Sequence, residues 1–147
     1  MTSISQVWDR TLAKSNDWIK QLGGELGWDD ANTTLLALRS VLHALRDRLP
    51  LDEAVELAAQ MPLLIKGVYF DGWNPSATPA KARTREEFFL LVRRPFPGGI
   101  TEADLGHMTR AVFKLLADHV PEGEIRDVRG VLPPELAELW PEAAGTR

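Results

Sequence analysis

The chain of 147 residues contains no cysteine. This absence excludes disulfide bonds, a thiolate nucleophile, zinc sites with cysteine ligands and iron–sulfur clusters. It is also compatible with a reducing compartment, and we expect a cytoplasmic location. No apolar run reaches the roughly 18 residues that a membrane span needs, and the first residues, MTSISQVWDR, lack the apolar core of a signal peptide. The sequence therefore predicts a protein that does not contact a membrane.

Motifs that mark common active sites are missing as well. The chain has no glycine-rich loop with Walker spacing, no Gly-x-Ser-x-Gly elbow and no His-x-x-x-His pair. We therefore predict no catalytic, cofactor-binding or metal-binding residue and favour a non-catalytic protein over an enzyme. The formal net charge of −4 argues against nucleic acid as the main partner, because proteins that neutralise phosphates carry a basic surface.

What the sequence does contain is an internal similarity. A constant shift of 71 positions aligns residues 39–69 with residues 110–140 without a gap. Seven aligned pairs are identical: Arg39/Arg110, Val41/Val112, Leu45/Leu116, Asp47/Asp118, Pro50/Pro121, Glu53/Glu124 and Pro62/Pro133. Because such periodicity indicates duplicated units, we predict a single domain, residues 1–147, with two repeats. The expected parts are a first repeat over about 4–70, a linker over 71–83, a second repeat over about 84–140 and a frayed tail over 141–147.

Apolar residues recur at helical spacing within each repeat. The first stripe consists of Leu35, Leu38, Leu42, Leu45 and Leu49. Steps of three and four residues place these side chains on one face of a helix, which predicts that the face is buried. The polar residues 32–34 are candidate N-caps, and Pro50 predicts a helix end near Arg48, since the residue before a proline leaves the helical region.

A further amphipathic helix is predicted before the long stripe of each repeat. The first uses Ile4, Val7, Trp8, Leu12, Trp18, Ile19 and Leu22. The second, TREEFFLLVRR, is short enough to form a strand, but Glu86 and Glu87 after Thr84 favour a helix start. The sequence therefore predicts an all-α fold. We expect a helical bundle of about eight helices, built from two repeats of about 70 residues that pack through their apolar stripes.

Two of the charged positions that both repeats share supply the first candidate site. These are Arg39 and Asp47 in the first repeat and Arg110 and Asp118 in the second. Charges on one helix face are typical of a solvated surface with ion pairs. Alternatively, the four side chains converge between the repeats and line a polar cleft for a small ligand or a reaction.

An aromatic turn supplies the second candidate site. The candidate partner surface consists of Tyr69, Phe70, Trp73, Arg83 and Arg85. Exposed aromatic rings at a turn favour binding of a protein partner or a second copy of the chain. Alternatively, the rings fold back and cover the joint between the repeats. The basic segment Lys81–Arg94 adds a further alternative, nucleic-acid binding through phosphate contacts.

The residues also resemble a known family. The stretch LRSVLHALRDRLPLDEAVELAAQMPLLIKGVYFDGWNP and the later IRDVRGVLPPELAELW resemble the bacterial and archaeal family called domain of unknown function 2267. The most specific parts are Arg46–Pro50, Ala59–Pro62, Gly67–Trp73 and Asp127–Trp140. The resemblance covers approximately Ile4 to Trp140, and Met61 stands where relatives usually have leucine.

This resemblance implies a small, soluble, all-helical prokaryotic protein, fused in some relatives to regulatory domains. It implies no activity, cofactor or catalytic residue. Together with the missing motifs, it favours a binding or regulatory module that acts through protein contacts, including those of a homodimer.

Overall fold

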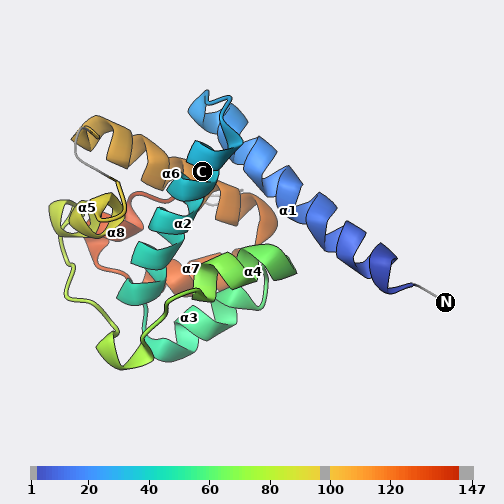
Figure 1. Cartoon of the computed structure of the whole chain (residues 1–147). Helices are drawn as coiled ribbons and strands as arrows, with labels where there is room; N and C mark the ends of the chain where they lie inside the picture. Colours follow the sequence, from blue (N-terminus) through green and yellow to red (C-terminus); the bar gives the residue numbers. More distant parts are fainter. Residues whose placement is uncertain (1–2, 97–99, 143–147) are drawn as a thin grey trace.

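The computed structural model describes residues 3–96 and 100–142, which form helices connected by short loops (Figure 1). The helices are α1 (Ile4–Leu26), α2 (Ala31–Arg48), α3 (Leu51–Ala58), α4 (Leu63–Phe70), α5 (Arg85–Arg93), α6 (Glu102–His119), α7 (Glu122–Gly130) and α8 (Pro134–Ala137), with a 3₁₀ turn at Pro75–Ala77. No strand occurs in this part of the chain. The predicted all-α fold of about eight helices is confirmed, and α5 replaces the alternative strand.

The long helix α2 begins at an aspartate cap. The Asp30 carboxylate accepts a hydrogen bond from the backbone N–H of Asn32 at 3.0 Å. The predicted N-caps at residues 32–34 therefore lie inside the helix, and that prediction is wrong, because Asp30 satisfies a free N–H group of the first turn. The predicted end at Arg48 is confirmed, since Leu49 has an extended backbone.

Prolines precede the short helices. The helices α3, α4, α7 and α8 follow Pro50, Pro62, Pro121 and Pro133. The bounds of α2 and α6 differ by 71 residues at both ends, and α3 and α7 also begin 71 residues apart. These spacings agree with the predicted repeats, and the duplication itself stays a prediction.

The two long helices form the centre of the bundle. Helix α2 contacts α6, and α3 contacts α7. Helix α1 packs against α2, α4 and α6, whereas α5 packs against α2, α6 and α8. The first helix of each predicted repeat therefore contacts the long helices of both repeats. The N-terminal half of α1 projects away from the other helices (Figure 1).

The apolar stripes meet in one continuous core. Its members include Leu38, Leu42, Leu45 and Leu49 of α2 and Val112, Phe113 and Leu116 of α6. Trp140 closes one end, with its ring stacked on Phe113 at a centroid distance of 4.1 Å. Leu35 is 38% exposed, contrary to the prediction from the stripe, because it adjoins the exposed first turn of α2.

The segment 71–83 packs against the bundle. Ala82 is buried, and its carbonyl accepts a hydrogen bond from Nε of Arg48 at 2.7 Å. Of the predicted tail over 141–147, residues 143–147 lie outside the described part of the chain. Among the helices that the structure describes, none combines the length and apolarity that a membrane span requires.

Candidate functional site

The predicted cleft residues Arg39 and Asp47 pair with residues outside the predicted cleft. The Arg39 guanidinium pairs with Asp71 at 2.8 Å, and both side chains are exposed. Asp47 pairs with Nε of Arg46 at 2.8 Å. Arg46 is buried, and its Nη1 donates hydrogen bonds to the carbonyl oxygens of Tyr69 at 2.8 Å and Asp71 at 3.0 Å. The buried cation of this half is therefore Arg46 and not Arg39.

The corresponding residues of the second half are also held apart. Asp118 accepts a hydrogen bond from the Gln21 amide at 2.8 Å and lies 3.5 Å from the Lys114 ammonium. Arg110 is exposed and forms no ion pair within the described residues. No ion pair joins Arg39, Asp47, Arg110 or Asp118 to another member of this set, and the polar cleft that would unite them stays a prediction.

The aromatic turn is largely folded into the protein. Tyr69 is fully buried, and its hydroxyl donates a hydrogen bond to the Ala54 carbonyl at 2.8 Å. Its ring meets the ring of Phe70 edge-on, with a centroid distance of 5.1 Å. The rings of Phe70 and Trp73 have a centroid distance of 5.3 Å. Phe70 and Trp73 are partly buried against the core. Tyr69 therefore belongs to the core and not to an exposed partner surface, since no partner can reach a fully buried ring.

The basic segment Lys81–Arg94 has part of its charge paired with carboxylates. The Arg85 guanidinium pairs with Glu138 at 2.9 Å, and the backbone N–H of Arg85 donates to Glu135 at 3.2 Å. These contacts join α5 to α8. Arg83 and Lys81 are exposed. One of the cations that a nucleic acid would need is therefore already paired with a carboxylate.

The helices α3 and α7 bring acidic side chains together that the sequence analysis did not connect. Oxygen atoms of Glu53, Glu124 and Asp127 all lie within 4.8 Å of one another. Glu56 also acts electrostatically on both glutamates. Glu53 precedes Glu124 by 71 residues, and Glu56 precedes Asp127 by the same number. The repeat contained this signal, but only the packing of α3 on α7 shows that the related residues meet.

The protonation of this cluster follows from its environment. Burial, then the neighbouring carboxyl group of Glu53 and the surrounding negative charges, raise the pKa of Glu124 to about 7. The pKa of Glu53 is also raised, first by burial. One oxygen of each glutamate is inaccessible to solvent and has no hydrogen-bond partner. Carboxylates suit hard cations such as Mg²⁺, but protonation of one glutamate relieves the same repulsion and agrees with the raised pKa of Glu124.

An apolar ridge occupies the projecting half of α1. It consists of Ile4, Val7, Trp8 and Leu12, which are 67%, 41%, 51% and 48% exposed. The sequence places these residues on the apolar face of a predicted amphipathic helix, and such a face is expected to pack against the core. The structure corrects this for the ridge, whereas Trp18 and Leu22 on the same helix are buried. Helical periodicity identifies an apolar face but does not show where the body of the protein ends.

A protein-family model matches most of the chain. The model of the family described as uncharacterized conserved protein (DUF2267) matches residues 15–139. The match runs from the middle of α1 to the residues just after α8, and the ridge precedes it. No curated protein matches the chain.

Proposed function

The chain belongs to the DUF2267 family of uncharacterized conserved proteins, which has no established activity, and we propose that it is a protein-binding module whose docking surface is the apolar ridge of α1. The exposure of the ridge carries this proposal. Its four residues are spaced along one helix face, and no other described helix covers them. Contiguous exposed apolar surface of this kind is typical of interaction sites, whereas scattered apolar residues are not.

The ridge continues the buried face of the same helix. Ser15, Trp18 and Leu22 are buried on the side of α1 that packs against the body. Steps of three and four residues from Ser15 lead back to Leu12 and Trp8, so the apolar face extends past the end of the core. A partner that packs on the ridge would therefore extend an existing packing surface.

Exposed apolar residues also occur on a helix that contacts α1. Helix α4 contacts α1, and its Leu63 and Leu64 are 52% and 43% exposed. A hollow of about 370 Å³ separates Lys14 and Asp17 of α1 from the turn before α4. An amphipathic helix that lays its apolar face on the ridge is a partner of suitable shape.

Charge indicates what kind of helix fits. Arg10 and Lys14 follow Val7 at intervals of three and seven residues, so two cations border one side of the ridge. Asp17 continues the same edge beyond the C-terminal end of the ridge. A partner helix with an apolar face and acidic side chains along its matching edge complements this border. Antiparallel pairing with a second copy would bring the basic borders together, which is unfavourable.

The test uses two synthetic helical peptides with the same leucine face, one bordered by glutamate and the other by lysine. Fluorescence anisotropy with labelled peptides measures their binding to the full chain. The glutamate peptide should bind more tightly, because its charges complement Arg10 and Lys14. The double substitution Trp8→Ser, Leu12→Ser should weaken binding at least tenfold, since two apolar anchors worth about 1.5–3 kcal/mol each are lost.

Leu90 supplies the matched control. It is an isolated exposed leucine on α5, 62% accessible, and Leu90→Ser should leave peptide binding unchanged. Equal binding by the wild type and the double variant would overturn the proposal. So would a ridge-dependent doubling of the mass at micromolar concentration, which would identify a second copy as the occupant. Ridge-dependent binding to anionic lipid vesicles without peptide binding would likewise contradict it.

A further inference from the structure

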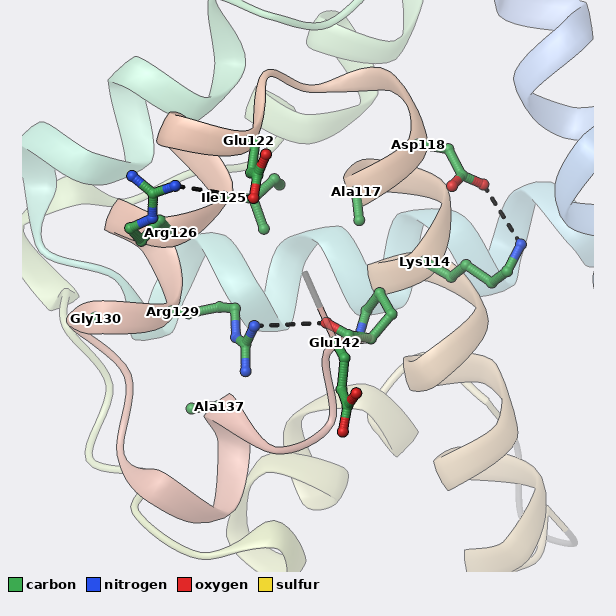
Figure 2. A pocket seen from close by; sticks show the side chains of 11 residues that line it. Lys114, Ala117, Asp118, Glu122, Ile125, Arg126, Arg129, Gly130, Ala137 and Glu142 are labelled. Carbon is green, nitrogen blue, oxygen red and sulfur yellow. Dashed lines mark hydrogen bonds and ion pairs between the residues drawn. The ribbon is translucent and has the colours of Figure 1, made fainter. Parts of the chain in front are cut away.

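A cavity of about 530 Å³ opens between α6, α7 and the residues that follow α8 (Figure 2). Ala117, Ile125 and Ala137 contribute apolar walls, and the side chains of Lys114 and Arg129 border the same space. The volume lies within the range of small-molecule sites, which combine apolar walls with a few polar groups. The cavity is distant in sequence from the ridge and lies on other helices.

The first half of the chain shows what fills the comparable position there. Arg46 stands 71 residues before Ala117. Its buried guanidinium donates hydrogen bonds to the carbonyl oxygens of Tyr69 and Asp71 at the end of α4. The methyl group of Ala117 is too short to make the contacts that the Arg46 side chain makes in the first half. The cavity is therefore open where the first half holds an arginine side chain.

The second half supplies an arginine from a different helix. Arg129 of α7 stands 71 residues after Ala58, so arginine and alanine exchange places between the halves. Its Nη1 donates a long hydrogen bond, 3.5 Å, to the carbonyl of Pro141 (Figure 2). Arg129 is partly buried. Its guanidinium thus enters the cavity from the side opposite Ala117.

The charges around the two arginines differ. Arg46 has the carboxylate of Asp47 at 2.8 Å. Asp118 stands 71 residues after Asp47, and it pairs instead with Lys114. No carboxylate among the described residues forms an ion pair with Arg129. Glu142 also lines the cavity but forms no ion pair with Arg129. A partly buried guanidinium without an ion-pair partner is a favourable anchor for a carboxylate, which it binds with two parallel hydrogen bonds.

We propose that this cavity binds a small organic anion, with its carboxylate on Arg129 and its apolar body between Ala117, Ile125 and Ala137. The ligand carboxylate supplies to Arg129 the charge that Asp47 supplies to Arg46. Lys114 lies within 3.6 Å of both Glu25 and Asp118, so its charge is already balanced. Arg129 is therefore the residue that selects for negative charge. This site is independent of the proposed docking surface.

The test compares three probes of nearly identical shape: 2-naphthoate, neutral 2-naphthamide and cationic 2-naphthamidine. Each is titrated into the full chain, and protein NMR signals report both the affinity and the location. Naphthoate should bind about tenfold more tightly than the amide, because the charged hydrogen bonds to Arg129 form only with the carboxylate. The amidine should bind weakest. The methyl signals of Ala117, Ile125 and Ala137 should shift most.

Substitutions identify the anchor. Arg129→Gln should weaken naphthoate binding about tenfold and leave naphthamide binding unchanged. Arg126→Gln is the matched control, because Arg126 borders the same cavity but pairs with Glu122. Ala117→Leu fills the cavity without touching Arg129, and it should weaken the binding of all three probes.

Three results would overturn the proposal. The first is equal affinity for naphthoate and naphthamide. The second is a set of shifted signals that lies outside the cavity. The third is an unchanged naphthoate affinity in folded Arg129→Gln, with folding verified by the dispersion of its amide signals. If Arg129→Gln does not fold, Ala117→Leu decides, since unchanged binding in that variant excludes the cavity.

Discussion

The two halves of the molecule follow one helical plan but stabilise it differently. In residues 31–70, Arg46 extends from the long helix and binds the carbonyl groups at the end of α4. In residues 102–141, position 117 is alanine and Arg129 reaches the chain after α8 from the neighbouring helix. The first arrangement fills the interior, and the second leaves a cavity. The comparison teaches that similar helices with similar ends can enclose either a buried arginine or a cavity.

The largest effect is expected when Arg46 and Arg129 are each replaced by methionine, which keeps most of the side-chain length. Arg46→Met removes two hydrogen bonds and the ion pair with Asp47, and it leaves buried acceptors without a partner. We expect the free energy of unfolding to fall by about 3 kcal/mol. Arg129→Met should cost about 0.5 kcal/mol, because its single hydrogen bond is long and partly exposed. Urea unfolding measures both values.

A similar loss in the two variants would break the comparison. It would mean that Arg129 supports its half as strongly as Arg46 does. A loss below about 1 kcal/mol for Arg46→Met would mean that the buried arginine is replaceable by apolar volume, as some buried ion pairs are.

The sequence was sufficient to predict the helices because their signals are local. Prolines end one helix and start the next, and apolar spacing marks the face that packs. The end of α2 at Arg48 and the helical state of α5 follow from such signals. The start of α2 was misplaced, because several consecutive polar residues can cap a helix and the sequence does not show which one does.

The sites were harder to predict because they depend on which helices meet. The ridge residues have the same spacing as the buried residues of α1, and only the position of the body distinguishes them. Glu53 and Glu124 were identified as identical positions, yet their contact requires the packing of α3 on α7. The cavity arises at an alanine, a residue that carries no chemical signal of its own.

The polar contacts of Tyr69 and Trp140 sharpen the comparison further. These residues stand 71 positions apart, and both are buried. The Tyr69 hydroxyl donates to Ala54, whereas the indole N–H of Trp140 has no partner within the described residues. Tyr69→Phe should therefore lower the free energy of unfolding by about 1.5 kcal/mol. Urea unfolding checks this value, and a cost near zero would show that the hydrogen bond does not stabilise the first half.

Absorbance of the phenolate gives a second readout for the same residue. Tyr69 is the only tyrosine of the chain, so no other side chain contributes. Burial is the main cause that raises the pKa of Tyr69 far above its ordinary value. Ionisation should begin above about pH 10 and coincide with unfolding. A phenol that titrates while the protein stays folded would contradict its burial.

The smallest effect concerns the place where the halves meet. Burial, with Glu53 next in importance, raises the pKa of Glu124 to about 7. The folded state therefore binds this proton more tightly than the unfolded state does. The resulting stability is fully present below the ordinary pKa of a glutamate and is lost as the pH rises through about 7. Because Glu124 keeps contact with water, we expect a loss of only about 1 kcal/mol between pH 5.5 and 8.5.

Substitution by glutamine isolates this contribution from that of other groups. Burial lowers the pKa of His43, whose contribution to stability is lost on acidification and so has the opposite sign. The informative quantity is therefore the difference between the wild type and Glu124→Gln, in which the effect of His43 cancels. The advantage of the variant over the wild type should be about 1 kcal/mol larger at pH 8.5 than at pH 5.5. Glu53→Gln should behave alike if one proton is shared, whereas Glu86→Gln, an exposed control on α5, should not. A gain for Glu124→Gln that does not depend on pH would show that folding does not raise the pKa of Glu124, and the halves would then meet without a bound proton.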